Sequence, residues 1–297
     1  MSASLRALLA PFAACDPLDV SARMVFALFL LSTWVSSDLW YWKLPLRVLA
    51  LTALVLPPLH RDPRLWAAFA ALLLSRTWVQ WFTQDNHLFL LTWFALGTAL
   101  ALRSPDPLRA TRESARLLIG LTFLLAALWK GLLSREFLDG SYFACTFLTD
   151  PRFHGAARVF GGVPDEALAR SYGLAASLST PGTAAVALEG LSPRLLLVSR
   201  CSAWWTLAIE AALALTFLAP AAWERLGRAR HALLWTFGAT TYLVIDIKTF
   251  GWSLMAVGAA QAEPERPGVR ALYFAVGLLI LALDYVPVLD WLAATGP

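Results

Sequence analysis

Apolar positions along the chain gather into long runs that are separated by short polar connections. Each run approaches or reaches the length that an α-helix needs to cross a bilayer core of about 30 Å. The pattern predicts an all-α fold, a polytopic membrane helix bundle with about nine transmembrane helices. The predicted segments are 21–37, 44–59, 65–82, 86–102, 113–130, 194–219, 230–246, 248–262 and 271–292.

The stretch 230–262 could form either two helices or one long tilted helix interrupted at Asp246 and Lys248. Charge placement favours the pair, because only then do all four arginine-rich connections fall on one side. The positive-inside rule places these connections and the N-terminus in the cytoplasm. The residues concerned are Arg61, Arg64, Arg103, Arg109, Arg112, Arg225, Arg228, Arg230, Arg266 and Arg270.

Composition strengthens the membrane interpretation. The chain has 297 residues, of which 59% are hydrophobic and 15% are charged, and a soluble protein of this size could not bury so much apolar surface. The sequence pI of about 9.2 does not indicate nucleic-acid binding, because the basic residues separate spans and form no continuous basic face. The expected partner is therefore the lipid bilayer, with no nucleic acid.

The segment 131–193 is the one large piece outside the predicted spans, and the topology places it on the extracytoplasmic side. Turn signals and one short helix, 164–170, closed by Gly173, are too little for an independent domain. The sequence therefore predicts a single membrane domain, 1–297, with 131–193 as an extracytoplasmic loop or cap within it.

Polar residues at the outer ends of two spans are candidates for chemistry. Asp85, Asn86 and His87 open the fourth span, and Trp129 and Lys130 close the fifth. Ionisable groups near spans usually face the bundle interior or a wet cavity, so we expect a shared pocket. The alternative remains that Trp129 and Lys130 are an interfacial anchor and that His87 only caps its helix.

Glu210 lies well inside the sixth span, where a carboxyl group needs a partner. It is either a functional residue or one end of a structural hydrogen bond between helices. Cys15, Cys145 and Cys201 have no CxxC spacing and no nearby histidine pairing, so no metal site is expected.

Two motifs in order resemble a known family. The segment 84–91, with Asn86 and His87, and the segment 124–130, followed by 137–140, are similar to signatures of the vitamin K-dependent gamma-carboxylases and of the related horizontally transferred transmembrane (HTTM) domain proteins. The likeness in span pattern covers roughly 18–262. A family histidine expected ahead of a Phe-Gly motif is not found before Phe250.

The resemblance implies a bacterial plasma (inner) membrane protein that binds a reduced, vitamin K-like quinone in an outward-facing pocket. It implies that Lys130 is the base and that His87 and Asn86 stabilise developing charge; Trp129, Glu210 and Asp85 are assigned to cofactor binding. If the chain is an enzyme, it is a gamma-carboxylase-like oxidoreductase or carbon-carbon lyase acting on a peptide or small substrate. The alternative is a non-enzymatic membrane partner, an export or maturation factor of the sporulation-delaying toxin B type, or a small redox partner.

Overall fold

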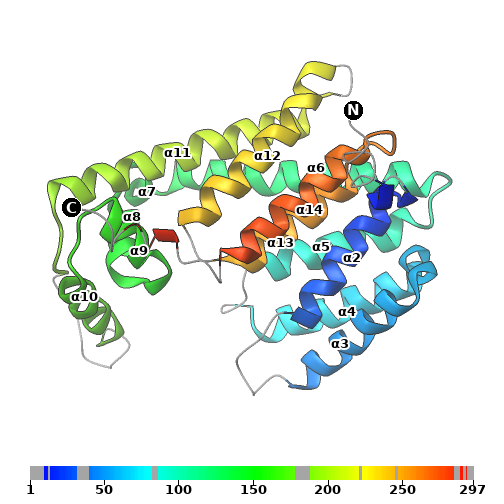
Figure 1. Cartoon of the computed structure of the whole chain (residues 1–297), viewed down its shortest axis with the longest axis horizontal. Helices are drawn as coiled ribbons and strands as arrows, with labels where there is room; N and C mark the ends of the chain where they lie inside the picture. Colours follow the sequence, from blue (N-terminus) through cyan, green and yellow to red (C-terminus); the bar gives the residue numbers. More distant parts are fainter. Residues whose placement is uncertain are drawn as a thin grey trace.

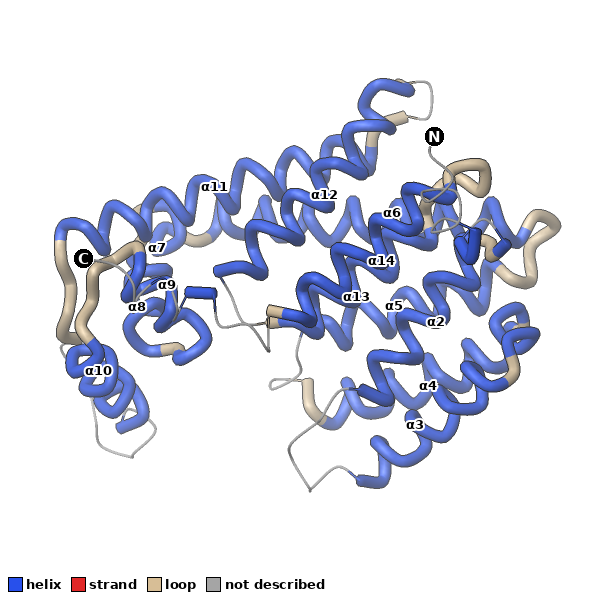
Figure 2. Tube along the Cα trace, viewed as in Figure 1, coloured by secondary structure: helices blue, strands red, loops and turns tan. Residues whose placement is uncertain are grey.

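A computed structural model describes residues 10–12, 14–31, 40–81, 86–177, 188–220, 223–244, 247–283, 288–289 and 292. Within these ranges the chain contains helices and the connections between them, and no strand (Figure 2). The all-α prediction is therefore confirmed for the described part of the chain.

Each of the nine predicted apolar segments corresponds to one helix. Local sequence signals explain several starts: α4, α6 and α11 begin with proline after a capping side chain, from Asp62, Asp106 and Ser192, that accepts a backbone N–H. The helices are α2 (Pro17–Leu31), α3 (Trp40–Val55), α4 (Pro63–Val79), α5 (Asn86–Ala101), α6 (Pro107–Leu128), α11 (Pro193–Leu218), α12 (Glu224–Val244), α13 (Lys248–Ala260) and α14 (Pro267–Ala282).

The stretch 230–262 forms two helices, because α12 ends at Val244, α13 begins at Lys248, and the two pack against each other. This confirms the pair over one long tilted helix. Asp246, where the single helix was expected to be interrupted, lies outside the described residues.

Two of the described helices are long and apolar enough to cross a membrane: Pro107–Leu133, of 27 residues, and Pro193–Leu218, of 26. The apolar helices α5 and α14 have 16 residues each, which corresponds to about 24 Å at about 1.5 Å per residue. That length is less than a typical bilayer core of about 30 Å. Nine helices are therefore present where nine spans were predicted, and nine crossings remain a prediction.

The centre of the bundle is α13, which is buried at every position from Gly251 to Ala260. It packs against α2, α5, α6, α12 and α14 (Figure 1). The indole N–H of Trp252 donates to the backbone oxygen of Met24 at 2.7 Å, which joins α13 to α2. A helix that is apolar all round is expected in such a central place.

The arginine-rich connections lie at the end of the bundle where the described N-terminal residues lie (Figure 1). Arg61 pairs with Asp16, and Arg270 donates to the backbone oxygens of Phe12 and Glu263 at 2.8 and 2.9 Å. These bonds link the turn 57–61, the N-terminal segment and the connection before α14. The four connections therefore share one end of the fold, as the charge pattern predicts; the side of a membrane that they face remains a prediction.

The opposite end carries a helical cap built from the segment predicted as a large loop (Figure 1). Its helices pack on the start of α11 around their own apolar cluster, which includes Phe137, Phe147 and Leu195. The predicted helix 164–170 is longer than expected, since it runs through Gly173 to Ser177. The cap consists of α7 (Arg135–Leu138), α8 (Ser141–Thr149), η4 (Pro151–Phe153), α9 (His154–Val159) and α10 (Asp165–Ser177).

Candidate functional site

Lys130 and Glu210 form an ion pair between α6 and α11. Lys130 lies in η3 (Trp129–Leu133), a π-helical turn that continues α6. Such turns are rare in proteins as a whole, but those that occur are often found at functional sites. Glu210 lies near the middle of α11, and its side chain is only 7% exposed, against 23% for Lys130. The partner that a carboxyl group needs at this depth is therefore the lysine 80 residues earlier in the chain.

The pair lies on the wall of a cavity of about 370 Å³ near the cap end of the bundle. Asn86, at the first position of α5, lines the same cavity. The rest of the lining is apolar and largely aromatic, from α5, α6, α12 and α13. These residues are Phe89, Leu90, Trp93, Leu118, Thr122, Phe123, Ala126, Phe237 and Phe250.

One acceptor in this cavity is unpaired. Among the described residues, Glu210 Oε2 is buried and has no hydrogen-bond partner, whereas Oε1 bonds to Lys130. An unsatisfied buried oxygen is costly, and this oxygen has almost no surface open to the cavity. The arrangement can hold a flat apolar molecule and offer the Asn86 amide and the Lys130 amine to its edge.

The predicted site residues do not all meet. Asn86, Lys130 and Glu210 line one cavity, but His87 is not in its lining. His87 is 5% exposed, and its Nδ1 lies 3.4 Å from the hydroxyl of Thr249 on α13. Trp129 is 62% exposed and also lies off the cavity lining, and Asp85 lies outside the described residues.

The turn 137–140 has a structural explanation. Gly140 has φ +87°, and a Cβ added there would lie 2.9 Å from the backbone nitrogen of Arg200 on α11, so only glycine fits this close approach. Hydrogen bonds from the hydroxyl and backbone N–H of Ser141 hold the pKa of Asp139 below its ordinary value. The Lys130 amine lies 5.3 Å from the centre of the Phe137 ring, so this turn brings the cap against the site.

Tyr242 is a neighbour of the site that sequence reasoning did not single out. Its side chain is buried, and its hydroxyl has no hydrogen-bond partner among the described residues. The centre of its ring lies 6.2 Å from that of Phe237, which lines the cavity. Tyr242 packs against Gly251, where an added Cβ would lie 2.7 Å from its ring. The one signal in the sequence was the position of Tyr242 near the predicted outer end of the seventh span.

No metal-binding cluster of three or more His, Cys, Asp or Glu side chains occurs in the part of the chain that the structure describes. Cys15, Cys145 and Cys201 are free thiols.

Comparisons with protein-family models, with curated proteins and with solved structures find no match for this chain. The functional interpretation therefore depends on the geometry of its own residues.

Proposed function

We propose that the chain is a multi-pass protein of the bacterial plasma membrane, with its N-terminus and arginine-rich connections in the cytoplasm and its cap outside. Large apolar side chains on its surface support this proposal: Trp78 is 80% exposed, Leu215 72% and Leu125 65%. Such exposure is unfavourable in water and ordinary against lipid. Exposed Trp40, Trp78 and Trp129 lie at helix ends on the cap side, where an aromatic belt is expected.

Within this membrane protein, the cavity beside Lys130 and Glu210 is proposed to bind a reduced, vitamin K-like quinone, as the HTTM and gamma-carboxylase resemblance implies. The observation that carries the proposal is the convergence of Asn86, Lys130 and Glu210 on one aromatic-lined cavity of about 370 Å³. The residues fit the group, since aromatic walls suit a planar ring and the polar side chains of Asn86 and Lys130 on the lining suit its hydroxyls.

In the proposed reaction, a quinol held by these residues would supply two electrons and a hydroxyl proton, and dioxygen would be the oxidant that takes the electrons. Lys130 is the base that takes its proton, after the ion pair with Glu210 opens or passes its own proton to the carboxylate. Asn86 donates its amide N–H to the oxygen on which negative charge develops. The proposed role of His87 is indirect, because it lies beside Thr249 and supports the start of α5. The base would serve modification of a peptide or small substrate.

The test uses the full chain in lipid nanodiscs loaded with a reduced quinone, and follows quinol consumption by absorbance. Lys130→Ala and Asn86→Ala are expected to lose activity, by about 100-fold for a positioned general base. Lys43→Ala is the matched control, because Lys43 lies on α3 and off the cavity lining. Wild-type rates in both Lys130→Ala and Asn86→Ala would rule out the enzyme assignment.

A second candidate function is a non-enzymatic membrane partner or export factor of the sporulation-delaying toxin B type. The observation that favours it is that the Lys130 and Glu210 pair joins α6 to α11, which a purely structural link would also do. Its test is co-purification. A protein partner that is present in stoichiometric amount and is lost when the cap is removed, together with no bound quinone, would favour this function.

A further inference from the structure

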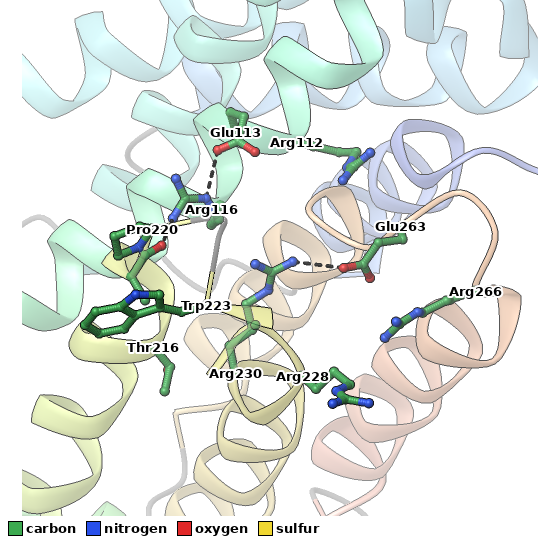
Figure 3. A pocket seen from close by; sticks show the side chains of 12 residues that line it. Arg112, Glu113, Arg116, Thr216, Pro220, Trp223, Arg228, Arg230, Glu263 and Arg266 are labelled. Carbon is green, nitrogen blue, oxygen red and sulfur yellow. Dashed lines mark hydrogen bonds and ion pairs between the residues drawn. The ribbon is translucent and has the colours of Figure 1, made fainter. Parts of the chain in front are cut away.

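A second cavity, of about 370 Å³, lies at the end of the bundle opposite the cap. Figure 3 shows its polar side chains coming from α6, from α12 and from the connection between α13 and α14. Five arginines and two glutamates line it, which leaves an excess of three positive charges in a confined space. The charged residues are Arg112, Glu113, Arg116, Arg228, Arg230, Glu263 and Arg266.

The two glutamates neutralise only two of these arginines. Arg116 Nε donates to Glu113 Oε2 at 2.8 Å, and an Nη of Arg230 lies 3.2 Å from Glu263 Oε1. The same Arg116 also donates to backbone oxygens at the end of α11. These bonds build the wall of the cavity and fix its shape.

The other three guanidinium groups have no carboxylate. Within the residues that the structure describes, Arg112, Arg228 and Arg266 form no ion pair, and Arg112 Nε is buried without a hydrogen-bond acceptor. Figure 3 shows Arg112 and Arg266 on either side of the space beside Glu263. Guanidinium groups match phosphate oxygens with paired, charge-assisted hydrogen bonds. The cavity thus has the chemistry of a phosphate site.

An apolar groove continues from this cavity. Ala219, Pro220 and Trp223 line both the arginine cavity and a second space of about 540 Å³ between α6 and α11. The groove is aliphatic and open to the surface, with Leu215 72% exposed. It reaches back along α11 to Leu207, about 16 Å from Leu218 at about 1.5 Å per residue.

We propose that these two spaces together bind one anionic phospholipid, with its phosphate among Arg112, Arg228 and Arg266 and an acyl chain in the groove between α6 and α11. A free phosphate compound would use the arginines and leave the groove empty, whereas a neutral lipid would leave the excess positive charge uncompensated. The continuity of the two spaces therefore favours an amphiphile. The site is independent of Lys130 and of any reaction there.

The experiment is native mass spectrometry of the full chain in detergent micelles, titrated with phosphatidylglycerol, phosphatidylcholine or inorganic phosphate. We expect one saturable equivalent of phosphatidylglycerol and weaker binding of phosphatidylcholine. The Arg112→Gln, Arg266→Gln double variant is expected to bind phosphatidylglycerol at least about tenfold more weakly, since charge-assisted hydrogen bonds are lost. Arg228→Gln, on an exposed residue, gives a second test should the double variant unfold.

The matched control is Arg103→Gln, because Arg103 is exposed at the same end of the bundle and lies off the cavity lining. It should bind like wild type. Leu215→Trp is expected to fill the groove and weaken lipid binding while leaving the arginines intact. Wild-type lipid affinity in the arginine variants would overturn the proposal. So would competition by inorganic phosphate together with no effect of Leu215→Trp, which would identify a free phosphate site instead.

Discussion

The two ends of the bundle use charge in opposite ways. Near the cap, one lysine and one glutamate neutralise each other on the wall of a cavity that is otherwise aromatic. At the far end, five arginines face two glutamates, and three guanidinium groups have no carboxylate partner among the residues that the structure describes. The first arrangement suits a neutral molecule that exchanges a proton, and the second suits a permanent anion.

A charged residue in an apolar bundle is therefore informative mainly through its partner. Lys130 and Arg112 both follow or precede apolar runs in the sequence, yet one is paired and the other is not. A buried pair that is broken leaves an uncompensated charge, whereas an unpaired arginine at an open end can still be reached by water or an anion.

The largest effect is expected from breaking the pair near the cap. Glu210→Leu leaves Lys130 with no carboxylate in the described part of its surroundings, and we expect a loss of about 3–5 kcal/mol in the free energy of unfolding. Reversible unfolding in mixed micelles measures it. The double variant Lys130→Met, Glu210→Leu should regain most of this stability and remain inactive, because replacing both charges removes the buried ion. A double variant as unstable as Glu210→Leu would contradict the ion-pair explanation.

An intermediate effect is expected at the arginine end when the pH falls. The His231 imidazole, whose Nε2 lies 3.3 Å from Glu263 Oε2, and the charge of Arg230 lower the pKa of Glu263 to about 2 from an ordinary value of 4.5. A carboxyl group whose pKa is lowered by folding stabilises the fold at any pH above the pKa that it has in the unfolded chain. This stabilisation is lost as the pH falls from about 5 toward 2. We expect a loss of about 2 kcal/mol between pH 6 and pH 3.

Unfolding free energies at pH 6 and pH 3 test this expectation against Glu263→Gln, which cannot titrate and should lose less stability over that interval. Glu265→Gln is the control, because Glu265 lies two residues away and is exposed. An equal pH dependence in wild type and Glu263→Gln would show that the contact between Glu263 and His231 does not contribute to the stability.

The smallest effect is expected from two glycines of the cap. Gly140→Ala forces a side chain into φ +87° against the backbone of Arg200, and we expect a loss of about 1–2 kcal/mol. Gly173→Ala is the matched change, because Gly173 lies within α10 with nothing within 4 Å of an added Cβ. It should stabilise the helix by up to about 1 kcal/mol. Thermal melting with limited proteolysis of the cap distinguishes the two, and equal effects would contradict the docking role of Gly140.

Most of the fold could be predicted because helix formation follows local patterns. Apolar runs marked all nine helices, and proline with a capping residue marked the starts of α4, α6 and α11. The arginine placement predicted which connections share an end and that 230–262 is a helical pair. The helix predicted over 164–170 and closed by Gly173 is shorter than α10. An exposed glycine is tolerated inside a helix, so Gly173 does not end it.

The candidate site was predictable only in part. The sequence indicates Lys130, Asn86 and Glu210 as candidates, because burying a polar or charged side chain in an apolar run is energetically unfavourable. The sequence alone determined the helices, their shared end and these residues, since each follows from the chain's own pattern. The pairing of Glu210 with Lys130 and the contact of His87 with Thr249 became visible only in the folded chain. Which residues face each other depends on how α5, α6, α11 and α13 pack. That packing is set by contacts between parts of the chain that are distant in sequence.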